Sequence, residues 1–459
     1  MNITQADMTN TIQTSKSFVI KISIVAALGG LLFGYDTAVI AGAIGFLKIK
    51  FDLSATLVGW AASSAIWGCV LGAMGAGYIS DRIGRKRGLI ITAVFFAVSA
   101  IGSAMANDLT TFILARFLGG LGVGAASMLS PLYIAEVSPA EKRGRLVTLY
   151  QLAIVIGIIL IYFINLRIAQ SGDETWNIET GWRLMLGSEV IPAMVFLLLL
   201  FFVPESPRWL VKQNADERAH YILEKVNGKL AANQILEEIK IALMQESGSI
   251  KSLFATQLRK AMVVGVTLAL FSQITGINAI IYYAPEIFKS IGFGAESAFS
   301  QTVIIGIVNM LFTFVALWLI DKTGRKPLLL WGISGMIVCL LGAGLCFYFS
   351  IDKGPWLLIF ILGFIASFAS SLGPIPWVMM SEIFPTKTRG IAMSFATLIL
   401  WLGVLAVTQL TPMLMEGIGG AYTFWLFMIN AIILLVFTWR KIPETKNRSL
   451  EEIEKIWQS

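Results

Sequence analysis

Charged residues are scarce in this sequence, and histidine and cysteine are nearly absent. Only 14% of the 459 residues are Asp, Glu, Lys or Arg, whereas 56% are hydrophobic, and the mean hydropathy is +0.77. A soluble globular domain carries about 25% charged residues, so the composition excludes that class. The sequence therefore predicts a membrane protein that crosses the bilayer many times.

The shortage of reactive and metal-binding side chains limits the chemistry of the chain. The three cysteines, Cys69, Cys339 and Cys346, lie in apolar runs without paired spacing, which favours small buried residues over disulfides or metal ligands. The single histidine, His220, lies in a polar segment, and no Ser/His/Asp pattern is present. We therefore expect no enzymatic activity, no metal and no cofactor.

The glycine-rich run GGLGVG at 119–124 resembles a phosphate-binding loop in composition alone. It lacks the lysine and the preceding strand that such a loop requires. Small residues at a close contact between membrane helices are the better explanation.

Long hydrophobic runs dominate the sequence. A helix needs about 20 apolar residues to cross roughly 30 Å of hydrocarbon, and twelve runs of this kind carry little or no charge. They lie near 22–47, 53–80, 88–107, 109–135, 146–166, 184–204, 261–285, 297–320, 327–351, 354–381, 390–415 and 417–439. We therefore expect an all-α membrane protein with twelve transmembrane helices.

The segments between these runs alternate in their content of Lys and Arg. Every second segment is rich in basic residues, for example RIGRKR after the second run and DKTGRK after the eighth. The positive-inside rule then places both termini in the cytoplasm, in a cell inner membrane. Because orientation in a lipid bilayer explains the net charge of +7, a nucleic-acid partner is not expected.

The two halves of the chain carry the same motifs about 240 residues apart. GYISDRIGRKRG returns as DKTGRKP, AEVSPAEKRG returns as SEIFPTKTRG, and PESPRWL returns as PETKNRSL. This repeat predicts an N-terminal half (1–204), a cytoplasmic helical connector (205–260), a C-terminal half (261–440) and a cytoplasmic tail (441–459). Transporters built from such repeats bind substrate between the halves, near the bilayer midplane.

These motifs, together with RFLGGLGVG, SQITGINAIIYYAP and GPIPWVMMSEIFPTKTRG, resemble the sugar porter family of the major facilitator superfamily over essentially the whole chain. GWRLMLGSEVIPA and YYAPEIFKS are most similar to the bacterial D-xylose–proton symporter branch, and less similar to the human facilitative glucose transporters. The resemblance implies the major facilitator fold and a monosaccharide substrate, a pentose such as xylose or a hexose such as glucose. We expect a monomer.

Only three ionisable Asp, Glu, Lys, Arg or His residues remain inside the twelve runs, namely Asp36, Arg116 and Glu189. An unpaired charge at the bilayer centre costs on the order of 3 kcal/mol, so such residues normally face an interior cavity and pair. The resemblance implies that Asp36 and Arg116 couple transport to protons, because the facilitative glucose transporters have Asn in place of the Asp. It places Glu189 in the same network.

We therefore expect proton-coupled sugar uptake by alternating access, with Asp36 as the proton-binding group. A static salt bridge between Asp36 and Arg116, a facilitative sugar uniporter and a sugar sensor of the same fold remain open as alternatives.

Sugar recognition needs side chains that donate and accept hydrogen bonds, and an aromatic surface for the C–H face of the ring. Polar and indole side chains match sugar contacts of the family at Gln151, Gln273, Asn278, Asn309 and Trp377. Aromatic candidates for lining or gating the site are Phe33, Tyr282, Tyr283 and Trp401. Each polar residue alone also fits a hydrogen bond between helices, which membrane proteins use routinely.

The chain departs from the family pattern at the expected sugar site. Ser272 and Leu400 stand where the family has amide side chains, Leu372 replaces a Trp, and Ile158 replaces a second Gln of the xylose symporter. Each amide lost removes about 1 kcal/mol or more of hydrogen bonding. The pocket is therefore expected to be less polar and roomier.

Charged residues also recur at matching places in the basic segments of both halves. They are Asp81, Arg85, Glu136, Arg143 and Glu205 in the first half, and Asp321, Arg325, Glu382, Arg389 and Glu444 in the second. The resemblance assigns them to a network that holds the cytoplasmic ends together while the outside is open. Some of these Lys and Arg residues are explained by their role in setting the membrane orientation. That role does not explain why acidic partners recur at the same places in both halves.

Overall fold

The structure, a computed structural model, describes residues 5–139, 143–245, 256–290, 294–351, 355–384, 389–446 and 453, without the side chains of 5–16 and of some residues at other helix ends. Within these ranges every regular element is a helix, as the sequence predicts. Eleven helical segments of this part of the chain are long and apolar enough to cross a membrane.

The helices follow the repeat of the sequence. The first half contains α1 (Gln5–Lys50), α2 (Ala55–Ile83), α3 (Arg85–Met105), α4 (Leu109–Val137), α5 (Arg143–Ala169), α6 (Glu174–Trp176), the π-helical turn η2 (Asn177–Gly181), α7 (Trp182–Gly187) and α8 (Val190–Leu200). The connector contains α9 (Pro207–Lys212), α10 (Asp216–Asn227) and α11 (Lys229–Gln245). The second half contains α12 (Thr256–Ile274), α13 (Ile277–Lys289), α14 (Ala295–Thr323), α15 (Arg325–Tyr348), α16 (Trp356–Ala369), α17 (Ile375–Ile383), α18 (Arg389–Gly417) and α19 (Gly419–Lys441).

The tenth hydrophobic run is divided in the structure instead of forming one long helix. α16 contains 14 residues, and α17 begins only after the segment SSLGP. Pro374 and Pro376 lack the backbone N–H that a continuous helix would donate. The chain turns through Gly373, whose N–H donates to Phe368 O at 2.9 Å.

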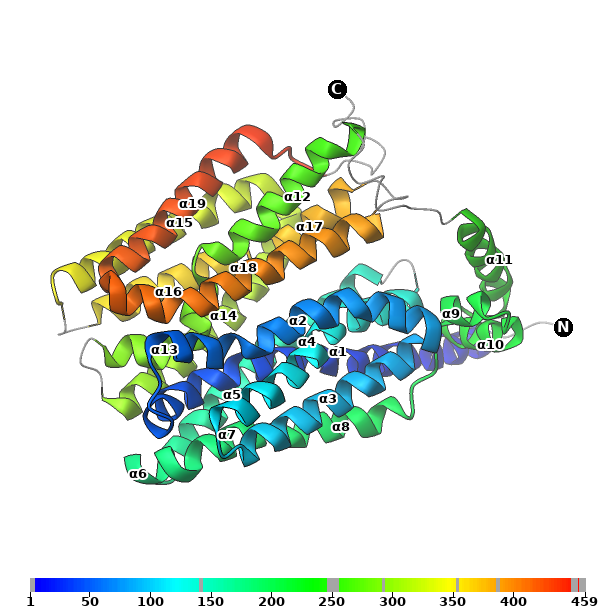
Figure 1. Ribbon diagram of the computed structural model, residues 1–459. Coiled ribbons are helices and arrows are strands. Elements are labelled where there is room, and N and C mark those ends of the chain that lie inside the picture. Colours follow the sequence, from blue (N-terminus) through cyan, green and yellow to red (C-terminus); the bar gives the residue numbers. More distant parts are fainter. Residues whose placement is uncertain are drawn as a thin grey trace.

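The two halves lie side by side, and the connector lies at one end of the first half (Figure 1). α1 to α8 form one bundle and α12 to α19 form the other, while α9 to α11 lie beyond the end of the first bundle. The start of α1 lies beside the connector helices.

Glycines allow α2 and α4 to cross at close range. A Cβ at Gly72 of α2 would overlap the backbone oxygen of Leu121, and a Cβ at Gly120 of α4 would overlap the backbone oxygen of Ala65. Only glycine permits such an approach, which is typical of small-residue interfaces between membrane helices. The run GGLGVG is therefore a helix contact, and that prediction is confirmed.

Hydrogen bonds join the halves at the end away from the connector. Gln409 of α18 accepts from Ser63 Oγ of α2 at 2.6 Å and donates to Thr56 O at 3.3 Å. Tyr162 of α5 donates to Ile281 O of α13 at 2.8 Å. Towards the connector end the two bundles diverge in Figure 1, so this conformation is closed on the opposite side.

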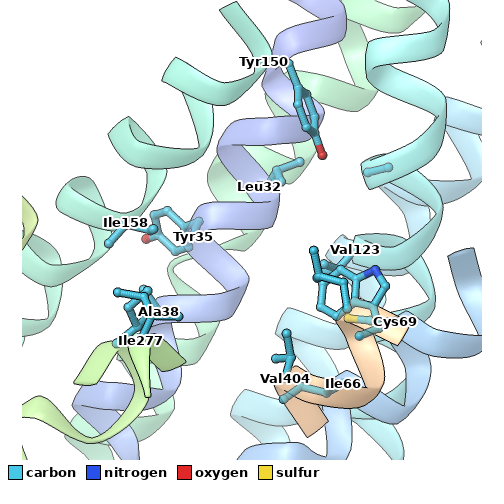
Figure 2. Packing of buried hydrophobic residues seen from close by; sticks show 14 of the residues in the cluster. Leu32, Tyr35, Ala38, Ile66, Cys69, Val123, Tyr150, Ile158, Ile277 and Val404 are labelled. Atoms are coloured by element: carbon cyan, nitrogen blue, oxygen red, sulfur yellow. The ribbon is translucent and has the colours of Figure 1, made fainter. Parts of the chain in front are cut away.

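Buried apolar side chains of both halves meet near these contacts (Figure 2). Val404 of α18 lies near Ile66 and Cys69 of α2, and Ile277 of α13 lies near Ala38 of α1. All three cysteines are free; Cys69 and Cys346 are buried, as expected, whereas Cys339 is only partly buried. The two halves therefore share an apolar core next to the contacts that close this side.

Candidate functional site

Asp36 of α1 and Arg116 of α4 form a buried ion pair within the first half. Arg116 Nη1 donates to Asp36 Oδ1 at 2.5 Å, and Arg116 Nη2 donates to Asp36 Oδ2 at 3.2 Å and to the Asp36 backbone oxygen at 2.9 Å. Each residue exposes only 1% of its surface. Contact through two guanidinium nitrogens fixes the orientation of the pair.

Glu189 lies beside this ion pair, at a break in the sixth span between α7 and α8. Pro192 cannot donate to the carbonyl of Ser188, which opens the helix at this point. The Glu189 carboxyl group is buried and lies within hydrogen-bonding reach of the Asp36 carboxyl group. Glu189 interacts electrostatically with both Asp36 and Arg116.

Tyr35 connects the helix break to α1. Its hydroxyl lies 2.7 Å from Ser188 Oγ, and Ser188 Oγ donates its hydrogen to Met185 O at 2.5 Å. Tyr35 therefore donates to Ser188. Because Tyr35 and Asp36 are neighbours on α1, this bond links the ion pair to the turn that carries Glu189. The three intramembrane charges, widely separated in sequence, meet in one site.

Side chains of the second half lie against the same site. Tyr282 of α13 is buried, hydrogen-bonds to Thr37 of α1 and interacts electrostatically with Asp36. The ring of Phe33 on α1 lies 5.6 Å from that of Trp401 on α18, measured between centroids. A movement of the second half would therefore change the surroundings of the ion pair.

Two of the predicted sugar-binding residues form a connected pair between α12 and α13. The helix breaks at Gly276, whose φ is 96°. Asn278 Nδ2 donates to Gln273 Oε1 at 2.7 Å, and Gln273 Nε2 donates to Ser272 Oγ at 2.9 Å. Ser272 Oγ donates in turn to Ala269 O at 2.8 Å. The hydroxyl that stands in place of a family amide therefore orients Gln273.

The remaining sugar-binding candidates come from other positions in the bundle. Gln151 of α5, Asn309 of α14 and Trp377 of α17 are partly buried, and the structure describes no hydrogen bond between them and the pair above. Tyr283 donates to Thr408 O at 2.8 Å and so ties α13 to α18. Of the predicted sugar-binding residues, Gln273 and Asn278 are therefore hydrogen-bonded to each other, whereas Gln151, Asn309 and Trp377 lie on three other helices.

The repeated charged motifs build a network at the connector end of the first half. Arg85 Nε contacts Glu136 at 3.0 Å, and Arg85 Nη1 contacts Asp81 at 2.8 Å. Lys212 of the connector contacts the other Asp81 oxygen at 2.9 Å, and Ser206 Oγ donates to Glu136. The network thus includes the connector.

The second half repeats this arrangement. Arg325 Nη2 contacts Glu382 Oε1 at 2.9 Å, and Thr445 Oγ1 donates to Glu382 Oε2 at 2.6 Å. Thr445 therefore takes the place of Ser206. The ion pairs with Glu136 and Glu382 each join residues of the same half in this conformation.

Glu205 and Glu444 occupy equivalent positions at the starts of α3 and α15. Glu205 accepts from the first two N–H groups of α3 at 2.9 and 3.0 Å, and Glu444 accepts from those of α15 at 3.1 and 3.0 Å. Such carboxylates satisfy free N–H groups and oppose the helix dipole. Burial raises the pKa of Glu444, but the backbone N–H donors outweigh it and hold the pKa below its ordinary value. Gly84 and Gly324, at φ 101° and 96°, leave room for the two carboxylates.

Arg143, Asp321 and Arg389 belong to the predicted network, but their side chains lie outside the described part of the structure. Sequence reasoning missed Ser206 and Thr445, which each add a hydroxyl donor. The motifs PES and PET contained the signal, because a hydroxyl residue follows the capping glutamate in both halves.

Comparison with known proteins agrees with this architecture. The family described as "Sugar (and other) transporter" matches residues 22–457. The chain is 48% identical to the arabinose-proton symporter of Bacillus subtilis (strain 168), over 96% of both chains. It is 40% identical to the D-xylose-proton symporter of Escherichia coli (strain K12), over 97% of both chains.

A solved structure shows the same arrangement of helices. The inward open conformation of the xylose transporter XylE from E. coli matches with a TM-score of 0.85 and 40% identity, over 96% of this chain and 100% of that one. The protein is therefore a transporter and not an enzyme, and it belongs to the sugar transporter family, the sugar porters of the major facilitator superfamily.

Proposed function

We propose that this protein is a sugar–proton symporter that takes up a monosaccharide by alternating access. The buried Asp36–Arg116 pair, with the Glu189 carboxylate beside it, carries the proposal. A static salt bridge needs one acid for one base, whereas this site holds two acids and one base. A single proton on either carboxylate makes the site neutral, which is the expected arrangement for an intramembrane proton relay.

Proton binding at Asp36 changes the contacts between the halves. Protonation removes the negative charge of Asp36 and with it the Coulomb attraction to the Arg116 cation, so the contact between the two side chains becomes weaker. Tyr282 of the second half interacts with the same carboxylate. The proton thereby biases an interface that has two arrangements, as alternating access requires.

We assign sugar binding to the polar and aromatic residues between the halves. The polar set is Gln151, Gln273, Asn278, Asn309 and Trp377, and the aromatic set is Phe33, Tyr283 and Trp401. Trp401 Nε1 is buried and has no hydrogen-bond partner among the residues described, so it is available to a sugar hydroxyl. The two relatives above are named for arabinose and D-xylose, which supports a pentose as the substrate.

We place the connector and both termini in the cytoplasm, with the protein in a bacterial inner membrane, as a monomer. The positive-inside rule supports this orientation. The hydrogen bonds between Gln409 and α2 then close the extracellular side, and the conformation faces inward. The match to an inward open relative supports the same assignment.

Uptake of labelled sugar by membrane vesicles tests the proposed function. With an inward proton gradient, the wild-type protein is expected to accumulate labelled arabinose or xylose above the outside concentration, and a protonophore is expected to abolish that accumulation. Equilibration without accumulation, unaffected by the protonophore, would identify a facilitative uniporter instead.

The cytoplasmic network predicts the effect of Glu382→Gln. In the outward-facing state the connector ends of the two halves approach, and we propose that Glu382 then faces the basic segments of the first half, including Arg143. Neutralising Glu382 is expected to weaken that state and to shift the protein towards the inward-facing conformation. Labelling of single cysteines placed on the cytoplasmic surface between the halves is expected to become faster.

Glu237→Gln is the matched control, because Glu237 is an exposed acid on connector helix α11, and the one ion pair described for it is with Lys240 of the same helix. It is expected to leave the labelling pattern unchanged. Equal labelling rates in wild type and Glu382→Gln would contradict the gating role.

A further inference from the structure

α13 of the second half ends in an ion pair that lies against α1 of the first half. Lys289 Nζ donates to Glu286 Oε1 at 2.9 Å, and the two residues are about one helical turn apart. A Cβ at Gly45 of α1 would overlap Glu286 Oε1 and would lie 3.3 Å from Lys289 Nζ. The glycine therefore lets both charged side chains approach the backbone of α1.

Two phenylalanine rings, one from each half, lie close to the same ammonium group. Phe46 of α1 and Phe299 of α14 stack with their centroids 6.2 Å apart and their planes at 13°. Lys289 Nζ lies 5.4 Å from the centroid of Phe46 and 5.9 Å from that of Phe299. Both distances are within the range of about 6 Å in which a cation is attracted to the face of a ring. One cation thus contacts an aromatic ring of each half.

These contacts exist only while the halves touch on the side away from the connector. Phe46 and Phe299 are 5% and 3% exposed, so water is nearly excluded from both rings. Lys289 and Phe299 belong to the same half and stay together when the halves separate. The contacts of Lys289 with Phe46 and Gly45 are then lost. A contact that is present in one of two conformations shifts the equilibrium towards that conformation.

We infer that Lys289 and Glu286 form a latch, a contact that stabilises the conformation closed on the side away from the connector. Glu286 fixes the flexible lysine side chain at Gly45, and the ammonium group then attracts one ring from each half. The apolar stem of the lysine covers the edge of the ring pair, as long charged side chains do on apolar surface. The inference rests on the proposed alternating access and adds a contact that sets the balance between its two end states.

Lys289→Met tests the latch, because methionine keeps an unbranched apolar side chain and removes the charge. Spin labels on Asp52→Cys, after α1, and Glu416→Cys, at the end of α18, report the distance between the halves on this side, and both positions are exposed. In nanodiscs without sugar or a proton gradient, the ratio of molecules with the long distance to those with the short distance is expected to rise about fivefold. This rise corresponds to about 1 kcal/mol at 1.4 kcal/mol per tenfold, the scale of an exposed cation–π contact. Lys289→Arg, which keeps the cation, is expected to retain the wild-type ratio.

Gly45→Ala disturbs the latch from the first half. The new methyl group would occupy the position of Glu286 Oε1. That oxygen is at the end of a flexible side chain and can move aside, so the variant is expected to fold. The displaced carboxylate no longer holds Lys289 at the rings, and the same distance ratio is expected to rise.

Lys50→Met is the matched control. Lys50 ends α1 as Lys289 ends α13, and each lysine side chain is 27% exposed. The ion pair described for Lys50 joins it to Glu179 of η2, within the first half. This variant is therefore expected to leave the distance ratio unchanged.

The outcomes separate the latch from proton coupling. A wild-type distance ratio in both Lys289→Met and Gly45→Ala would overturn the latch and leave the symporter proposal in place, because the distances are measured without a proton gradient. A rise of equal size in Lys50→Met would also overturn the latch. Sugar uptake that ignores a protonophore would overturn proton coupling, whereas the distances would still decide whether the latch exists.

Discussion

Asp36→Asn is expected to abolish uphill sugar uptake while exchange between loaded sites continues. Asn retains an oxygen that can accept hydrogen bonds from Arg116, but it cannot bind a proton. One charge moved through 100 mV supplies about 2.3 kcal/mol, which supports roughly a 40-fold sugar gradient at 1.4 kcal/mol per tenfold. In the variant the ratio of inside to outside sugar is expected to fall to one. Labelled-sugar uptake under an imposed potential measures the ratio, and counterflow measures exchange.

Asp52→Asn is the control for this substitution. Asp52 is exposed in the turn after α1 and has a φ of 48°, a conformation that Asn adopts readily. It is expected to accumulate sugar as the wild type does. Uphill uptake that persists in Asp36→Asn would show that the proton binds elsewhere, and Glu189→Gln would then identify whether the second carboxylate carries it.

Gly120→Ala is expected to destabilise the protein strongly although it adds a single methyl group. The new Cβ would overlap the backbone oxygen of Ala65 on α2, and a backbone atom cannot move aside as a side chain does. Overpacking of this kind costs about 1–3 kcal/mol, and more where the structure cannot relax. The variant is expected to show a lower midpoint of thermal unfolding in detergent and a lower yield of monodisperse protein.

Gly77→Ala provides the matched comparison in the same helix pair. Gly77 lies on α2, and a Cβ there would meet nothing within 4 Å. Alanine favours a helix over glycine by about 1 kcal/mol, so this variant is expected to unfold at the wild-type temperature or slightly above it. An equal loss of stability in both variants would contradict the close α2–α4 crossing as the cause.

The candidate proton site could be predicted from the sequence because charge inside a hydrophobic run is costly. Asp36, Arg116 and Glu189 interrupt apolar stretches where an unpaired charge has no favourable environment. Their pairing was therefore an expectation from energetics alone, and the distances between Asp36 and Arg116 agree with it. Their role in proton transfer stays a prediction.

The supporting residues could not be identified in this way. A serine in a membrane helix, such as Ser99, commonly bonds to its own helix, so its type and spacing do not mark it. Only the approach of α3 to α4 at Gly119 places that hydroxyl at the same face of α4 as Asp36. The hydrogen bond from Gln273 to Ser272 could not be predicted from the sequence either, because it depends on the helix break at Gly276.

The membrane class, the helical spans and the duplicated halves of this protein can be read from its sequence alone. The length of each hydrophobic run, the basic residues of the loops and the repeated motifs are properties of contiguous segments, so they are visible without coordinates. Three features depend on the packing of the helices, namely which side is closed, how the tenth span is divided and which polar groups surround Glu189. These features depend on contacts between helices that are distant in sequence, such as Gln409 with Ser63, and no local pattern contains them.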